Sequence, residues 1–93
     1  MNAGAAPITV LIVDDEPAIR RFLRTSLTAQ GYRAVEAGNG ATALDHLRQG
    51  SIDVLVLDLG LPDMNGLDII ERLRGQGSAV PIIVLSARSD EWV

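Results

Sequence analysis

The chain has 93 residues, a formal net charge of −4 and no cysteine, and 47% of its residues are hydrophobic. This length allows one small domain with a thin core, and the lack of cysteine excludes disulfides, thiolate metal sites and cysteine nucleophiles. All eight basic residues are arginines and they form no basic block, so nucleic-acid binding by this segment is not expected.

The first apolar run, residues 8–13, is rich in β-branched residues, which predicts a strand buried on both faces. Six residues are too few for a signal peptide or a membrane span, so we expect a cytoplasmic protein without membrane contact. A helix is expected over 17–30, where apolar residues recur at helical spacing and Gly31 follows. Its predicted N-cap is Asp14 or Asp15. Its inward-facing residues are predicted to be Ile19, Phe22, Leu23 and Leu27.

The rest of the chain alternates predicted strands and helices at regular intervals. Strands are expected at 33–37, 54–58 and 81–86, and helices at 40–49 and 66–74. The apolar stripe of the last helix is predicted to be Leu67, Ile70 and Leu73. Strands separated by helices indicate a parallel sheet with right-handed crossovers. The predicted fold class is therefore α/β, with a doubly wound parallel sheet.

Polar residues gather at the carboxyl ends of the predicted strands. Asp14 and Asp15 follow the first strand, Asp58 ends the third, and Ser86 ends the fourth. Ligands bind at this edge of open α/β sheets, so the carboxylates are expected to share one cleft if the first and third strands are neighbours. Helix capping alone would also explain Asp14 and Asp15. It would not explain Asp58, which follows a buried strand directly.

Carboxylates that share a cleft repel one another, and Mg²⁺ relieves this repulsion because it prefers oxygen ligands. Such a metal would screen an incoming phosphoryl group, and a carboxylate would attack it. Asp58, at the end of a rigid strand, is the candidate nucleophile. Asp14 and Asp15 are then the metal-binding pair, and the Ser86 hydroxyl is a donor to a phosphoryl oxygen.

Three motifs carry a resemblance to a known family: LIVDDE at 11–16, VLDLGLPDMNG at 56–66 and PIIVLSAR at 81–88. In this order and spacing they resemble the receiver domain of two-component response regulators, which implies a flavodoxin-like (CheY-like) fold with strand order 2-1-3-4. Within the family, the chain is most similar to winged-helix transcriptional regulators of the OmpR/PhoB type. The stretches AIRRFLRT at 18–25 and LSAR at 85–88 resemble the Kdp potassium-response regulators in particular.

The resemblance implies a role for each candidate residue. Asp58 would accept a phosphoryl group from a sensor histidine kinase, and Ser86 would be the switch hydroxyl near that group. The metal ion, Mg²⁺, would be held by Asp14, Asp15, Asp58 and the backbone carbonyl of Gly60. In the intact family, such a receiver controls a DNA-binding transcriptional output domain. The implied function is a phosphoacceptor signalling domain that assists its own phosphoryl transfer, not an enzyme with turnover.

Receivers of this family continue through a fourth helix, a fifth strand and a fifth helix, which are not expected within 1–93. Their lysine at the end of the fifth strand has no counterpart, because this chain contains no lysine. We therefore expect a single, incomplete receiver domain over 1–93 without an output domain. The apolar segment 82–85 would then form an exposed sheet edge, through which two chains are expected to pair as a homodimer.

Two alternatives stay open at this level. In the first, the chain is a truncated receiver that no longer accepts phosphate and acts only through protein–protein contact. In the second, it is a phosphotransferase or phosphatase with an aspartyl nucleophile. That enzyme would need another acid two residues after Asp58 or a cap domain, and position 60 is a glycine.

Overall fold

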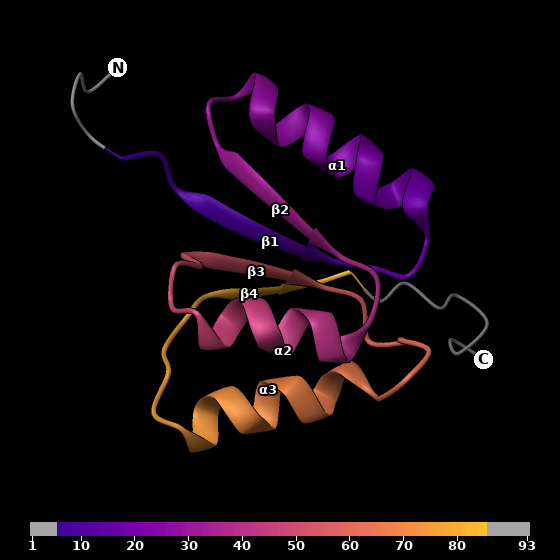
Figure 1. Ribbon diagram of the computed structural model, residues 1–93, viewed down its shortest axis with the longest axis vertical. Coiled ribbons are helices and arrows are strands. Elements are labelled where there is room, and N and C mark those ends of the chain that lie inside the picture. Colours follow the sequence, from indigo (N-terminus) through magenta and orange to yellow (C-terminus); the bar gives the residue numbers. More distant parts are fainter. Residues whose placement is uncertain (1–5, 86–93) are drawn as a thin grey trace, which may run out of the picture.

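The computed structural model describes residues 6–85 and shows strands and helices in strict alternation (Figure 1). The elements lie at the predicted positions, with their ends shifted by a residue or two. The strands are β1 (Thr9–Val13), β2 (Arg33–Ala37), β3 (Val54–Leu57) and β4 (Ile82–Val84). The helices are α1 (Pro17–Ala29), α2 (Gly40–Arg48) and α3 (Gly66–Gly75).

The four strands form one parallel sheet in the order β2-β1-β3-β4. This confirms the predicted doubly wound fold and its strand order. Helix α1 packs on one face of the sheet, and α2 and α3 cover the other (Figure 1). In this order, β2 lies on one side of β1 and β3 lies on the other. The winding direction of the sheet therefore reverses at β1, and the carboxyl ends of β1 and β3 flank this point.

Alternate side chains of the central strands point to opposite faces of the sheet, and both sets are buried. On the α2/α3 face, Leu11 and Leu55 pack against Ile69 of α3 in the larger cluster. On the α1 face, Ile12 packs with Leu23 of α1 in a smaller one. The central strand β1 is buried along its whole length, as its uninterrupted apolar run predicts.

Two predictions for α1 are wrong. Its N-cap is Glu16, which makes no side-chain capping bond, because the helix begins at Pro17 and the predicted caps lie too far ahead of it. Phe22 does not face inward but is 68% exposed. The stripe that contacts the sheet is Leu23 and Leu27, which are four residues apart and lie over β1 and β2.

One prediction for α3 is wrong, whereas β4 is partly exposed at the sheet edge, as expected for segment 82–85. Leu67, expected inside, is 48% exposed, and the fully buried residue of α3 is Ile69, four positions before the buried Leu73. In β4, Ile83 is 56% and Val84 is 45% exposed. Within residues 6–85 this strand lies at the sheet edge, so its apolar sequence is only partly covered.

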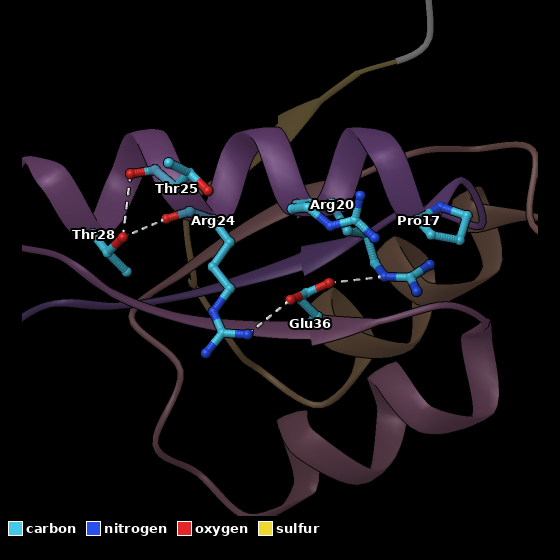
Figure 2. A pocket seen from close by; sticks show the side chains of 7 residues that line it. Pro17, Arg20, Arg24, Thr25, Thr28 and Glu36 are labelled. Carbon is cyan, nitrogen blue, oxygen red and sulfur yellow. Dashed lines mark hydrogen bonds and ion pairs between the residues drawn. The ribbon is translucent and has the colours of Figure 1, made fainter.

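Helix α1 is also tied to β2 by charged side chains (Figure 2). The Glu36 carboxylate of β2 pairs with Arg20 Nε at 3.1 Å and with an Arg24 guanidinium nitrogen at 3.2 Å. The Arg20 side chain is therefore only 20% exposed. These pairs border a groove between α1 and β2 that is lined by Pro17, Arg20, Arg21, Arg24, Thr25, Thr28 and Glu36.

None of the three helices within residues 6–85 combines the length and the apolar composition needed to cross a membrane.

The start of α3 lies against the chain that leaves β3. A Cβ added to Gly66 would lie 2.8 Å from Leu59 Cα and 2.9 Å from the carbonyl oxygen of Asp58. These neighbours are backbone atoms and cannot rotate away. Only glycine therefore fits at this position. By contrast, a Cβ on Gly75, at the other end of α3, would meet no atom within 4 Å.

We predict opposite effects of the same substitution at these two glycines. Gly66→Ala should lower the free energy of unfolding by about 1–3 kcal/mol, because the added methyl group forces the Asp58–Leu59 backbone to move. Gly75→Ala should raise it by about 0.4–1 kcal/mol, because alanine restricts the unfolded chain without a clash. Urea denaturation of both variants measures these changes, and equal effects at the two sites would contradict the close approach at Gly66.

Candidate metal centre at the carboxyl ends of the strands

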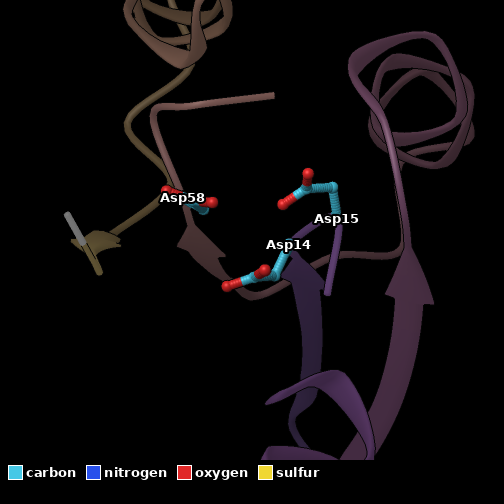
Figure 3. A group of neighbouring side chains, drawn as sticks. All are labelled: Asp14, Asp15 and Asp58. Carbon is cyan, nitrogen blue, oxygen red and sulfur yellow. The ribbon is translucent and has the colours of Figure 1, made fainter. Parts of the chain in front are cut away.

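Three carboxylates meet at the carboxyl edge of the sheet (Figure 3). Asp14 and Asp15 follow β1, and Asp58 follows β3. One oxygen from each lies within 4.8 Å of the others. The predicted convergence of these residues in one place is confirmed.

Strand pairing explains why Asp14 and Asp58 lie side by side. Val13 of β1 is in register with Leu57 of β3, so the next residue of each strand emerges at the same level. The backbone N–H of Asp58 donates to the Val13 carbonyl at 2.9 Å. The N–H of Asp14 donates to the Ala37 carbonyl at 3.1 Å, so β2 holds the other side of the site.

Asp14 is the buried member of the cluster, with 3% of its surface exposed. Burial raises the pKa of Asp14, and the negative charges of Asp58 and Asp15 raise it further. A hydrogen bond from the Glu16 N–H to Asp14 Oδ1, at 2.9 Å, and the Arg20 guanidinium act in the opposite direction. The folded chain therefore holds a buried carboxylate whose charged form is disfavoured.

The other two carboxylates are more accessible. Asp15 is exposed and Asp58 is half-buried. Asp58 Oδ1 accepts a hydrogen bond of 3.2 Å from the N–H of Gly60, which turns the loop after β3 back toward the carboxylate. Gly60 in turn bridges to Asn65, just before α3. Asp58 is thus held by the strand on one side and by a folded loop on the other.

The donor set fits a hard divalent cation. All three ligand candidates are carboxylates, and Mg²⁺ prefers oxygen ligands, commonly one or two carboxylates together with retained water. A cation here would also remove the repulsion that raises the pKa of Asp14. Gly60 lies beside Asp58 and donates its N–H to that carboxylate, whereas the predicted switch residue Ser86 lies outside the described residues.

Sequence reasoning missed Arg20 as part of this site. A guanidinium nitrogen of Arg20 donates to the backbone carbonyl of Asp14 at 2.7 Å, while Nε pairs with Glu36. A Cβ on Gly38 would lie 3.1 Å from the same nitrogen, so Gly38 leaves room for the guanidinium. The sequence signal that could have indicated Arg20 is its position about one turn into the helix that follows the acidic pair.

Comparison with known proteins identifies the family. The family model for the response regulator receiver domain matches residues 10–93. The chain is 53% identical over 81 residues to the transcriptional regulatory protein KdpE of Mycobacterium tuberculosis, covering 87% of this chain and 35% of that protein. It is 55% identical over 82 residues to the KDP operon transcriptional regulatory protein KdpE of Escherichia coli, covering 88% of this chain and 36% of that protein.

A solved structure has the same fold. The N-terminal domain of a response regulator receiver protein from Methanoculleus marisnigri matches with a TM-score of 0.82 and 30% sequence identity, covering 89% of this chain and 69% of that one. The chain belongs to the response regulator receiver domain family. The predicted likeness to the Kdp regulators is confirmed. The chain spans about a third of the length of these curated relatives.

The raised pKa of Asp14 predicts a specific dependence of stability on pH. Because the folded state binds this proton more tightly than the unfolded state does, Asp14 contributes stability that is present below about pH 4 and is lost as the pH rises through its folded pKa. Asp14→Asn should remove this loss, so in metal-free buffer the variant should gain stability relative to the wild type as the pH rises from 3.5 to 7.

Urea denaturation across this pH range, with EDTA present, measures the effect. Asp68→Asn is the matched control, because it removes one negative charge from an exposed position on α3. A constant difference between wild type and Asp14→Asn at every pH would contradict the prediction.

Proposed function

We propose that this receiver domain is a phosphoacceptor in which Asp58 takes a phosphoryl group from the phosphohistidine of a sensor histidine kinase. A carboxylate oxygen of Asp58 forms the new P–O bond, the P–N bond to the imidazole breaks, and the released imidazole keeps the electron pair and takes up a proton. The product is an acyl phosphate on Asp58. The observation that carries this proposal is the meeting of three carboxylates at the carboxyl ends of β1 and β3.

The surroundings of Asp58 support the role of nucleophile. It lies at the end of a buried strand, so its backbone is fixed, yet its side chain is only half-buried and can be reached from solvent. The Gly60 N–H engages Oδ1 and orients the carboxylate, which leaves Oδ2 as the candidate attacking atom. A fixed nucleophile lowers the entropic cost of reaching the attacking geometry.

We further propose that the acidic cluster binds Mg²⁺ through Asp14, Asp15, Asp58 and the backbone carbonyl of Gly60. When bound, this ion supplies positive charge that screens the carboxylates from the oxygens of an incoming phosphoryl group. Arg20 holds the Asp14 backbone and so keeps the buried carboxylate in place. Ser86 is proposed as the switch hydroxyl beside the phosphoryl group, on the strength of its place in the family motif.

The relatives are transcriptional regulators about three times as long as the matched segment. We therefore propose that residues 1–93 form a single, incomplete receiver domain of such a regulator, working in the cytoplasm on a DNA-binding output domain. The domain acts as a signalling acceptor that assists its own phosphorylation and dephosphorylation. The convergence of the acids favours this proposal over a receiver that has lost its phosphoacceptor chemistry.

Acetyl phosphate with Mg²⁺ tests the phosphoacceptor directly. Intact-mass spectrometry should detect one added phosphoryl group on the wild type, because the small donor needs no kinase contact. Asp58→Asn should abolish the adduct, because an amide oxygen is a poor nucleophile, and EDTA should abolish it by removing the cation. Asp53→Asn is a matched control, because this acid lies at the opposite end of β3 and should leave the adduct unchanged.

No adduct on folded wild-type protein, or an adduct of equal yield on Asp58→Asn, would contradict the proposed role of Asp58.

We also propose that β4 pairs with β4 of a second chain. The exposed Ile83 and Val84 lie on a strand that is at the sheet edge within residues 6–85, where backbone groups can accept another strand. Sedimentation velocity should show association that rises with concentration, and Ile83→Arg should abolish it. Phe22→Arg, at an apolar position of α1 that is also more than half exposed, is the control and should leave the association unchanged. A wild-type monomer at all concentrations would refute the pairing.

A further inference from the structure

The loop between β3 and α3, residues 58–65, reaches across to a second helix. This β3–α3 loop begins with Asp58 and includes Gly60. Near its other end, the carboxylate of Asp63 accepts two hydrogen bonds from the start of α2. Oδ1 accepts from the N–H of Gly40 at 2.7 Å, and Oδ2 accepts from the N–H of Ala41 at 3.0 Å. These donors lie more than twenty positions away in the sequence, so the contact joins two elements that are separate in the chain.

These bonds complete the start of α2. The first backbone N–H groups of a helix have no partner within it, and a negative charge there is favoured. Asn39, the N-cap, accepts a hydrogen bond from the Thr42 N–H at 2.8 Å. The two preceding N–H groups of the helix, those of Gly40 and Ala41, donate to Asp63. The same two hydrogen bonds hold the pKa of Asp63 below its usual value, so the carboxylate stays charged. We call the pair of bonds from Gly40 and Ala41 to Asp63 the α2 clamp.

Hydrogen bonds and contacts within the loop couple the position of Asp63 to that of Asp58. The N–H of Gly66 donates to the Leu59 carbonyl at 2.8 Å, and Gly60 bridges to Asn65. Met64 also lies against Gly40, where an added Cβ would overlap its side chain. A shift at the clamped end of the loop would therefore move Gly60 and the carboxylate to which its N–H donates.

We propose that Asp63 is a positioning residue for the metal and phosphoacceptor site, acting through the β3–α3 loop and touching neither the ion nor the phosphoryl group. This inference rests on the proposed function, because it assumes that Asp58 and Gly60 hold Mg²⁺. By anchoring the loop to α2, the clamp keeps these two ligands near Asp14 and Asp15. Asp63 itself is exposed, so its replacement leaves the hydrophobic core intact.

The clamp could instead serve only to start α2, and the affinity for Mg²⁺ separates the two roles. A merely structural residue, when replaced, lowers the stability of the protein but leaves the affinity of the folded molecules unchanged. A positioning residue changes that affinity. Removal of a residue that orients a metal ligand commonly weakens metal binding by about 10–100-fold.

The experiment is a calorimetric Mg²⁺ titration of the full 93-residue chain and three variants, below their unfolding transitions. Asp63→Ala should weaken Mg²⁺ binding about tenfold, because both bonds of the clamp are lost. Asp63→Asn should lie between this variant and the wild type, because its amide oxygen still accepts one of the two bonds. Asp68→Ala is the matched control, because it removes an exposed acid of the same charge next to the loop, and it should bind Mg²⁺ as the wild type does.

Amide hydrogen exchange at Gly40 and Ala41, followed by NMR, reports the clamp without any metal. Exchange should speed up at these two amides in Asp63→Ala. If this variant does not fold, Asp63→Asn decides the question by the same two measurements.

Faster exchange with an unchanged Mg²⁺ affinity would overturn the positioning role, and so would equal weakening in Asp68→Ala, which would indicate a general charge effect. A wild type that binds no Mg²⁺ would refute the proposed function itself. By contrast, equal Mg²⁺ affinities of the wild type and Asp63→Ala would refute only the role of Asp63.

Discussion

Parallel pairing of β1 with β3 places Asp14 and Asp58 at the same level of one sheet edge, and the site depends on this register. A shift of one residue would turn one carboxylate to the opposite face of the sheet. The burial of both strands between α1 on one side and α2 and α3 on the other makes such a shift costly, because it would disrupt the close packing of apolar side chains on both faces. The hydrophobic core thus sets the geometry of a polar site that adds no apolar contacts to the core.

The acidic cluster acts against the stability of the fold that positions it. Asp14 is buried next to two other carboxylates, so its ionisation is disfavoured in the folded state. A cation bound only by the folded chain would convert this repulsion into stabilisation, which couples metal binding to folding. Backbone contacts around the cluster, from Arg20 to Asp14 and from Gly60 to Asp58, hold the acids in place against their repulsion.

Sequence patterns predicted the elements of this fold well and the orientation of individual helices less well. In α1, the spacing predicts that both Phe22 and Leu23 face inward, but packing against the sheet buries only the Leu23 side and leaves Phe22 exposed. In α3, the same uncertainty exchanged Leu67 for Ile69. Where apolar residues are adjacent in the sequence, their spacing defines the buried face of a helix only to within about one residue's rotation. Packing against the sheet then decides which of these residues is buried.

The sequence by itself determined the α/β alternation, the acids at the ends of the strands and the family motifs, because these depend on residue type and spacing along the chain. Only the tertiary structure decided which charged side chains support the site. Arg20 reaches the Asp14 carbonyl, and Asp63 binds the amides of Gly40 and Ala41. Both contacts end on backbone atoms, and because every residue carries the same backbone groups, no sequence pattern marks which of them a distant side chain will meet.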